Sequence, residues 1–251
     1  MISFGIYFSI LRKALYGLKQ APRAWNSNID SYFQHFGLQH SQSEPSLYVK
    51  CEGKNFLFIY LYIDDLIYAG TNLKMVQDFK KVMMTKFEIT DFRLMKYFLG
   101  FQVKQSRGGI FILQEKYVEN LLKKFKMKDC KPVSTPMALN EKMQQDDDAD
   151  MADEKLLRSL VGSLIYLTNT RPDIMQSVSV LRFMSKPSKV HYAAVKRILR
   201  YLQGSKNLGL KYVKELNNKL IGFIDSDWAG SMDDRKSTSR YLFCLGSKMI
   251  S

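Results

Sequence analysis

Residues 56–69 read Phe-Leu-Phe-Ile-Tyr-Leu-Tyr-Ile-Asp-Asp-Leu-Ile-Tyr-Ala, and no other segment constrains the architecture as strongly. Two adjacent carboxylates, Asp64 and Asp65, interrupt apolar, β-branched and aromatic residues of the kind that favour strands. A buried strand has no room for unpaired carboxylates, and neighbouring like charges raise each other's pKa unless a cation neutralises them. The pattern predicts a hairpin that presents both carboxylates to a divalent metal such as magnesium. A solvent-facing turn, which aspartate also favours, is the alternative that this stretch alone leaves open.

The segments on either side of this hairpin have helical and strand periodicities. Helices are predicted over residues 22–37, 71–87, 115–125, 156–169 and 188–202. Strands are predicted over residues 46–51, 55–63, 66–69, 97–105 and 110–114. A strand, a loop and a second strand are predicted from Gly222 onward. Thr71 is a suitable N-cap for the second helix, and Gly37 is a suitable end for the first.

The composition describes a globular and strongly basic chain. Of its 251 residues, 46% are hydrophobic and 25% are charged, which is enough for one or two domains with a sizeable core. The formal net charge of +14 favours a polyanionic partner, although a merely soluble basic surface has the same sign. Basic residues recur beside aromatic ones, as in Lys123-Lys124-Phe125-Lys126, and this mixture suits phosphates and stacked bases.

The three cysteines are far apart in the sequence, at Cys51, Cys130 and Cys244. They have no zinc-ligand spacing, and an odd number argues against a disulfide framework. The first eleven residues lack the basic start and the cleavage site of a signal peptide, and they are too short to cross a bilayer, which takes roughly 20 residues. We therefore expect an intracellular protein without a membrane segment, and cytoplasmic and nuclear locations are not distinguished.

Several blocks of sequence are specific when they are taken together and in order. They are Leu15–Trp25 (Leu-Tyr-Gly-Leu-Lys-Gln-Ala-Pro-Arg-Ala-Trp), Tyr62–Asp65 (Tyr-Ile-Asp-Asp), Lys96–Gly100 (Lys-Tyr-Phe-Leu-Gly), Leu160–Thr168, Thr170–Ile174, Asp225–Gly230 and Asp233–Ser239. Over residues 11–251 the chain resembles the reverse transcriptase and ribonuclease H region of copia-type LTR retrotransposon Pol polyproteins. The resemblance implies RNA-directed DNA synthesis with Mg²⁺, an RNA template, a DNA primer, an RNA–DNA hybrid and deoxynucleoside triphosphates. No membrane partner is expected, and the oligomeric state stays open.

The resemblance also implies a fold and a division of the chain. The expected fold class is α+β: a partial polymerase palm with an antiparallel sheet and the Asp-Asp hairpin, a helical thumb and connection, and the beginning of a ribonuclease H-like α/β domain. The predicted divisions are residues 1–114 for the palm with its primer-grip hairpin, 115–145 for the thumb, 146–217 for an acidic linker and the connection, and 218–251 for the N-terminal part of the ribonuclease H-like domain.

Individual residues receive roles from the same resemblance. Asp64 and Asp65 would hold the ions of a two-metal site, in which one ion activates the attacking hydroxyl and the other holds the triphosphate. Asp225 would be the first metal carboxylate of ribonuclease H. The nucleotide and template site would be lined by Gly17, Lys19, Gln20 and Pro22, and the primer would be positioned by Leu99 and Gly100. Without the resemblance, residues 17–22 read more simply as an ordinary turn before a helix.

The chain departs from the family at both ends. A two-metal site needs about three carboxylates, and in the family the third lies on a strand upstream of the Leu15 block. The fourteen residues before Leu15 contain neither aspartate nor glutamate, and the fingers are missing as well. The other ribonuclease H carboxylates would lie beyond Ser251. We therefore expect a truncated and inactive fragment; the alternatives are a non-catalytic nucleic-acid-binding remnant and a gene product without function.

Three other patterns indicate no site. Residues 146–154 hold six acids and are expected to be an exposed, mobile linker, because no glycine or turn organises them as metal ligands. Residues 225–230 also fit the start of a calcium loop, but Ala229 and Lys236 stand where ligands are required. No serine–histidine or cysteine–histidine arrangement is apparent. The histidines are isolated and receive no ligand role: His35, His40 and His191.

Overall fold

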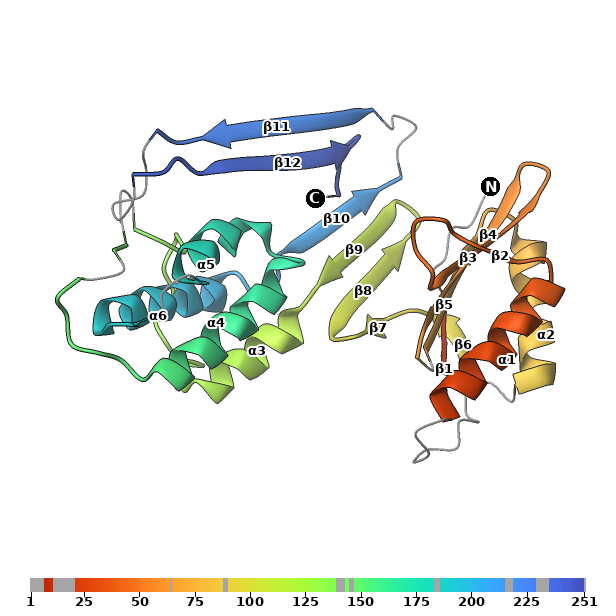
Figure 1. Ribbon diagram of the computed structural model, residues 1–251, viewed down its shortest axis with the longest axis horizontal. Helices are drawn as coiled ribbons and strands as arrows, with labels where there is room; N and C mark the ends of the chain where they lie inside the picture. Colours follow the sequence, from red (N-terminus) through yellow and green to blue (C-terminus); the bar gives the residue numbers. More distant parts are fainter. Residues whose placement is uncertain are drawn as a thin grey trace. The chain divides into compact units, whose positions relative to one another are not determined.

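The computed structural model describes residues 7–10, 21–63, 65–87, 90–138, 143–144, 147–182, 186–214, 219–228 and 235–250. The chain divides into two compact units, Met1–Lys96 and Tyr97–Ser251, and each has helices and antiparallel sheet (Figure 1). The predicted α+β class with antiparallel sheets is therefore confirmed. Within the ranges given above, no helix combines the length and the apolar character needed to cross a bilayer.

The first unit is a six-stranded antiparallel sheet with two helices. Its strand order is β2-β3-β4-β5-β1-β6. The elements are β1 (Tyr7–Ile10), α1 (Ala21–His35), β2 (Gln39–His40), β3 (Leu47–Glu52), β4 (Asn55–Tyr62), β5 (Asp65–Gly70), α2 (Leu73–Phe87) and β6 (Thr90–Leu94). Figure 1 shows α1 and α2 on the same side of the sheet.

Among the described residues of the first unit, helices cover one face of the sheet and none covers the other, which is called the open face. Alternate residues of β4, Leu57 and Ile59 among them, are buried in one core with Phe33 of α1 and Phe79 of α2. The residues between them face the other way, and Phe58 is 40% exposed. The unbroken apolar run of β4 thus belongs to a strand that is buried on one face only.

The second unit combines two antiparallel sheets with a helical core. Its elements are β7 (Tyr97–Phe98), β8 (Phe101–Ser106), β9 (Gly109–Leu113), α3 (Glu115–Lys124), α4 (Glu154–Thr168), η1 (Pro172–Ile174), α5 (Met175–Arg182), α6 (Lys189–Gly204), β10 (Gly209–Val213), β11 (Leu220–Ser226), β12 (Ser239–Leu245) and β13 (Lys248–Met249). The sheet orders are β10-β9-β8-β7 and β11-β12-β13. Apolar residues of α3, α4, α5 and α6 form one core.

The two compact units meet between Lys96 and Tyr97, so the hairpin at Leu99 and Gly100 lies in the second unit. The boundaries at 114, 145 and 217 describe functional segments and stay predictions.

Two local predictions are corrected. The predicted strand over residues 97–105 is a hairpin, β7 and β8, because the chain turns at residues 99 and 100. The N-cap of α2 is Asn72 rather than Thr71: the Asn72 Oδ1 accepts from the backbone N–H of Lys74 over 2.8 Å. The Thr71 hydroxyl oxygen instead accepts from the backbone N–H of Phe56, also over 2.8 Å, so it joins the helix start to β4.

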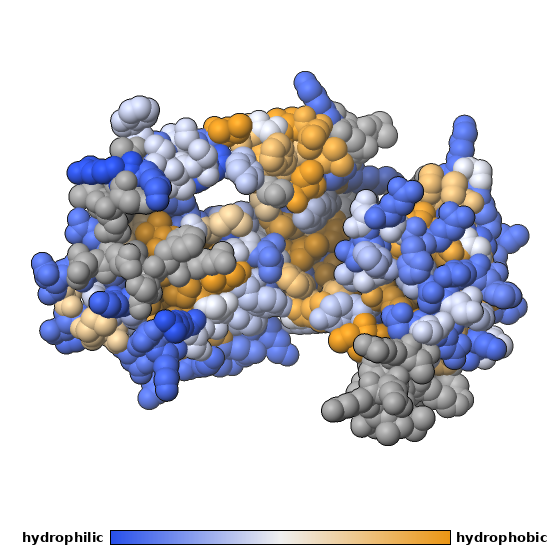
Figure 2. Space-filling view, in the orientation of Figure 1, coloured by the Kyte–Doolittle hydropathy of each residue, from blue (hydrophilic) through white to orange (hydrophobic). Residues whose placement is uncertain are grey.

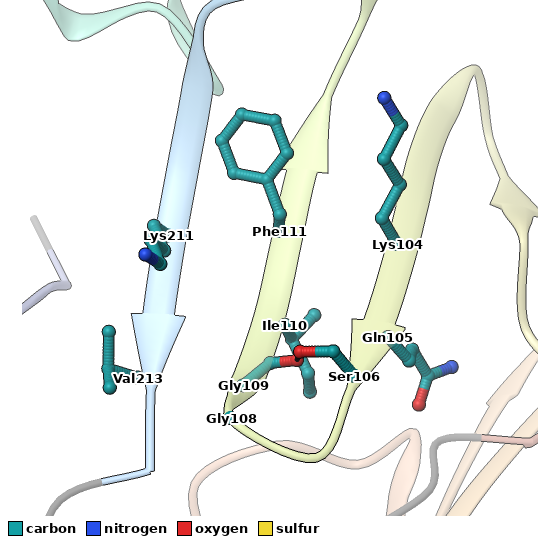
Figure 3. Close-up of a pocket in the computed structure, with 9 residues that line it drawn as sticks. All are labelled: Lys104, Gln105, Ser106, Gly108, Gly109, Ile110, Phe111, Lys211 and Val213. Atoms are coloured by element: carbon teal, nitrogen blue, oxygen red, sulfur yellow. Dashed lines mark hydrogen bonds between the residues drawn. The ribbon is translucent and has the colours of Figure 1, made fainter.

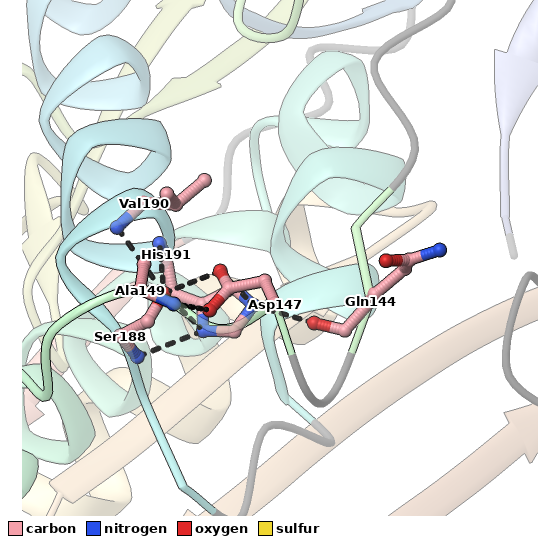
Figure 4. A network of polar contacts seen from close by, with 6 residues as sticks. All are labelled: Gln144, Asp147, Ala149, Ser188, Val190 and His191. Carbon is pink, nitrogen blue, oxygen red and sulfur yellow. Dashed lines mark hydrogen bonds and ion pairs between the residues drawn. The ribbon is translucent and has the colours of Figure 1, made fainter.

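The described part of the acidic run, which is predicted to be an exposed and mobile linker, makes defined contacts. The Ser188 hydroxyl donates to Asp147 Oδ2 over 2.6 Å (Figure 4), and Lys189 Nζ lies 2.7 Å from Asp150 Oδ2. Asp153 caps α4 by accepting from a backbone N–H of its first turn. Because Ser188 and Lys189 begin α6, the described part of the run is held against the start of that helix.

His191 lies in the same network and is fully buried, so the view of it as isolated is wrong. Its Nδ1 accepts from the backbone N–H of Ser188 over 2.9 Å, which leaves Nε2 to donate to the carbonyl of Gln144 over 2.8 Å (Figure 4). Since Nδ1 is engaged and the Ser188 hydroxyl donates to Asp147, this is no activated serine. His191 completes the capping box of α6.

The β11–β12 pair exposes apolar side chains on the surface of the second unit. Phe223 is 56% exposed, Ile224 is 80% exposed and Tyr241 is 66% exposed. Figure 2 shows an apolar patch at the upper centre, where these strands lie in Figure 1. Among the residues that the structure describes, neither hydrophobic core includes a residue of this sheet.

Candidate functional site

The β4–β5 hairpin has a strained residue at its tip. Tyr62 pairs with Asp65 as the last pair of the ladder, and Ile63 follows Tyr62 directly. Ile63 has a φ of +55° and is 72% exposed. A positive φ is a genuine outlier for a β-branched residue, and such strain persists where the surrounding structure imposes it, often at functional sites. Asp64 lies outside the described residues.

Asp65 belongs to the open face of the sheet. Leu66, the next residue, is fully buried against the helices, and successive side chains of a strand point to opposite faces. The adjacent strand β1 places Ile10 opposite Asp65 and Ser9 opposite Leu66. Strand β1, which lies beside β5, therefore carries no carboxylate.

A complete metal site is not present in the described part of the chain. Nowhere in those ranges do three aspartate, glutamate, histidine or cysteine residues come close enough to hold an ion. Asp65 is the described carboxylate of the Asp-Asp pair, and β1 supplies no third ligand. The described donors do not make up a two-metal site, which needs about three converging carboxylates.

The predicted nucleotide-site residues fall mostly where the structure is not described. Gly17, Lys19 and Gln20 lie outside the described residues. Pro22 is the second residue of α1, which confirms the prediction that proline occupies the first turn of this helix. Their common role stays a prediction.

The turn between β7 and β8 has the backbone of a tight hairpin. Leu99 has a φ of +46° and Gly100 a φ of +84°, and Phe98 pairs with Phe101 across the turn. Two successive positive φ values match the turn type whose twist suits antiparallel strands. Leu99 is 44% exposed, so its side chain stays accessible at the tip.

Tyr166 of α4 supports this turn from behind. Its hydroxyl donates to the carbonyl of Leu99, and a Cβ at Gly100 would lie 2.7 Å from the Tyr166 hydroxyl oxygen. The ring packs edge-on against Tyr117 of α3, with 4.9 Å between centroids. Burial raises the pKa of Tyr166, so the hydroxyl keeps its proton and remains a donor. Sequence reasoning missed this contact, although Tyr166 lies in the matched block Leu160–Thr168.

A buried polar cluster holds the next matched block in place. The Arg171 guanidinium, 1% exposed, makes a two-pronged contact with Asp173 at 2.9 and 2.7 Å. It also donates to the backbone carbonyl and the hydroxyl of Ser205 at the end of α6. Tyr201 donates its hydroxyl to Asp173 over 2.7 Å. The cluster joins residues 171–173 to the end of α6 and has a structural role.

A neighbouring pair extends this framework toward the β7–β10 sheet. The Thr170 hydroxyl donates to Gln114 Oε1 over 2.8 Å, and both residues are 1% exposed. Gln114 follows β9 directly and precedes α3. This hydrogen bond thereby joins the end of β9 to the segment that follows α4.

On β11, Asp225 lies beside the cationic side chain of Arg240. Arg240, its cross-strand partner on β12, places an Nη1 atom 3.4 Å from Asp225 Oδ2. Another Arg240 nitrogen lies 3.9 Å from Asp227, whose Oδ1 accepts from the backbone N–H of Thr238. Arg240 therefore lies beside both carboxylates, and the role of Asp225 as a metal ligand stays a prediction.

Comparison with known proteins gives consistent matches along the chain. Residues 8–139 match the family described as Reverse transcriptase (RNA-dependent DNA polymerase). The Retrovirus-related Pol polyprotein from transposon RE1 of Arabidopsis thaliana is 39% identical over 98% of this chain, which spans 17% of that polyprotein. The corresponding polyprotein from transposon TNT 1-94 of Nicotiana tabacum is 37% identical over 96% of this chain, or 19% of its own length. An uncharacterized mitochondrial protein of Arabidopsis thaliana is 36% identical over 78% of this chain and 81% of its own length.

Proposed function

The chain belongs to the reverse transcriptase (RNA-dependent DNA polymerase) family, in the copia-type retrotransposon Pol branch, and we propose that it binds a primed template without extending it. It spans about a sixth to a fifth of the length of the polyproteins named above, so their whole activity is not carried over to it. In this proposal the first unit holds the remnant of the polymerase centre, and the turn at Leu99 and Gly100 meets the primer.

The strained backbone at Ile63 supports the part of this proposal that puts a remnant of the polymerase centre in the first unit. A solvent-facing turn has no need of a β-branched residue at positive φ, because glycine or asparagine would fill that position without strain. A connection that must hold Asp65 beside the open face accounts for the strain.

We propose that Asp64 and Asp65 bind magnesium only weakly. When bound in such enzymes, magnesium activates the attacking hydroxyl and neutralises the triphosphate. The donor set of the described residues is incomplete for a two-metal site. Among those residues, Asp65 supplies one carboxylate on the open face of the sheet.

The remaining predicted residues complete the proposal. Gly17, Lys19, Gln20 and Pro22 would line the nucleotide and template site, where glycine permits close approach of a strand to the backbone. Leu99 and Gly100 would position the primer, supported by the hydrogen bond from Tyr166. The substrates that this implies are an RNA template, a DNA primer, their hybrid and deoxynucleoside triphosphates.

The second candidate is a non-catalytic remnant that binds nucleic acid through its basic surface. In this case the residues of the polymerase site have no role in binding. The formal charge of +14 favours this candidate, as does Arg240, whose guanidinium lies 3.4 Å from Asp225. For residues 218–251 this means that no hybrid-cleaving site is expected, although they are proposed as the start of a ribonuclease H-like domain.

Primer extension tests the proposal directly. Purified residues 1–251 are incubated with a labelled primer on an RNA template, deoxynucleotides and Mg²⁺, beside the double variant Asp64→Ala, Asp65→Ala. We expect both proteins to bind the primer–template in a salt-sensitive way. We expect neither to extend the primer, because correct positioning of the reactants can account for roughly 7–11 kcal/mol of the activation barrier.

Two outcomes contradict this. Extension by the parent chain and not by the variant means that another acid completes the site. Equal affinity at low and high salt means that the charge of +14 does not form an electrostatic interface.

A further inference from the structure

A row across the β8–β9–β10 sheet sets an aromatic ring between two lysines. Phe111 of β9 pairs with Lys104 of β8 on one side and with Lys211 of β10 on the other, so the three residues lie next to one another on the same face. Both lysines are exposed and Phe111 is half-buried. Figure 3 shows the ring over β9, between Lys211 and Lys104. From the spacing of strands, the backbones of the two lysines are roughly 10 Å apart.

The sheet is hollowed beside this row by a pocket of about 380 Å³ (Figure 3). The adjacent row on the same face consists of Ser106, Gly109 and Val213, whose small side chains leave open the space next to the Phe111 ring. Replacing Gly109 by any other residue would strain the backbone. Its φ is +154°, and an added Cβ would clash with the carbonyl oxygen of Tyr212. The pocket therefore rests on a fixed backbone.

The charge of the pocket selects its occupant. Lys104 and Lys211 are its charged lining residues, and none of the residues that line it is acidic. A ring face can stack with any base, and an ammonium group on either side suits the phosphates before and after that base. The formal charge of the chain, +14, points to the same class of ligand.

We propose that Lys104, Phe111 and Lys211, here called the lysine–aromatic row, bind a single strand of nucleic acid. One base stacks on Phe111, and the two flanking phosphates contact the lysines. The strand is single because a duplex hides its base faces within the stack. Neither contact involves the 2′-hydroxyl, so RNA and DNA of one sequence bind alike. This inference rests on the proposed function and adds to it a contact beyond the Leu99–Gly100 turn.

Fluorescence anisotropy with the full chain tests the stacking contact. The probes are a labelled single-stranded RNA, the DNA of the same sequence, and a blunt DNA duplex. Phe111→Leu keeps an apolar side chain without a ring, and Phe111→Trp keeps a ring. We expect Phe111→Leu to weaken single-strand binding roughly fivefold or more, Phe111→Trp to retain it, and duplex binding to change in neither.

The salt dependence tests the lysines separately, with little risk to folding because both are exposed. In the Lys104→Ala, Lys211→Ala variant, the slope of log affinity against log salt for a single strand should fall by about 1.4, since each lost phosphate contact removes about 0.7. Lys74→Ala with Lys81→Ala removes two exposed lysines of α2 and is the matched control. Its slope should change much less.

The outcomes separate this inference from the proposed function. If the parent chain binds neither single strands nor duplex, both fail. If it binds them but the row variants behave like the parent and the α2 control, the row is not the site and the proposed function stands. If polyglutamate binds as tightly as RNA and loses affinity in the same variants, the row serves an acidic protein partner and the inference is overturned.

Discussion

At the scale of the residue, the buried side chain of Arg171 should contribute strongly to the free energy of unfolding. It is fully buried and depends on Asp173 to balance its charge. Removing one partner of a buried pair leaves an uncompensated charge, which costs about 3–5 kcal/mol. We predict that Asp173→Ala lowers the free energy of unfolding by this amount in urea titration. Glu154→Ala removes the partner of the exposed Arg158 and should cost less than about 1 kcal/mol. Equal effects of the two substitutions would contradict a buried pair.

The same carboxylate predicts how stability changes with pH. Burial alone would raise the pKa of Asp173, but the hydrogen bonds from Arg171 and Tyr201 outweigh it and hold the pKa below its ordinary value. A carboxylate with a lowered folded-state pKa stabilises the protein above its unfolded pKa of about 4 and loses this contribution as the pH falls through the folded value. The gap in unfolding free energy between parent and Asp173→Ala should be constant near neutral pH and shrink below about pH 4. A gap that stays constant in acid would exclude this linkage.

At the scale of the element, the β7–β8 turn and α4 should be energetically coupled. Gly100→Ala introduces a Cβ at positive φ and against the Tyr166 hydroxyl, whereas Tyr166→Phe removes that hydroxyl and its bond to Leu99, worth about 1 kcal/mol. We predict that Gly100→Ala costs less in the Tyr166→Phe background, with a coupling of at least about 0.5 kcal/mol in a double-mutant cycle of unfolding free energies.

Gly53 provides the control for this cycle. It has a φ of +61°, and nothing lies within 4 Å of the Cβ that alanine would add. Gly53→Ala therefore carries the conformational cost without the clash, and its effect should be the same with Tyr166 or Phe at position 166. Additive effects of Gly100→Ala and Tyr166→Phe would mean that the helix does not support the turn.

At the scale of the whole molecule, the two units have separate cores and should respond separately to core substitutions. The chain has two tryptophans: Trp25 is half-buried in the first unit, and Trp228 is 95% exposed. Tryptophan emission should therefore report unfolding of the first unit. We predict that Phe33→Ala lowers the urea midpoint seen by emission, at a cost of about 3–5 kcal/mol.

Leu164→Ala in the core of the second unit gives the reciprocal measurement. It should cost about 2–5 kcal/mol, seen as earlier loss of helical circular dichroism, with the midpoint of the emission change preserved. If each substitution moves both signals together, the two units unfold as one.

The local part of this structure could be predicted from the sequence and the long-range part could not. Apolar periodicity located the main helices and the β4–β5 hairpin, because it reports which face of an element is buried. The Tyr166–Leu99 bond and the Arg171 cluster join residues far apart in the chain, which no local pattern encodes. Even the cap of α2 was misassigned, since Thr71 and Asn72 are both able to cap and a contact with Phe56 decides between them.

Strand β10 is synthesised long after its partner β9, and this delay leaves β9 without that partner during translation. Its partner β9 emerges from the ribosome first, and Val213 follows Gly109 only about a hundred residues later. At roughly 5–20 residues per second, β9 waits about 5–20 s with one hydrogen-bonding edge unpaired. An open edge of this kind invites pairing with other nascent chains, and synthesis of adjacent copies on one messenger would bring such edges together. Until β10 has been synthesised, this edge of β9 is therefore open to pairing with another chain.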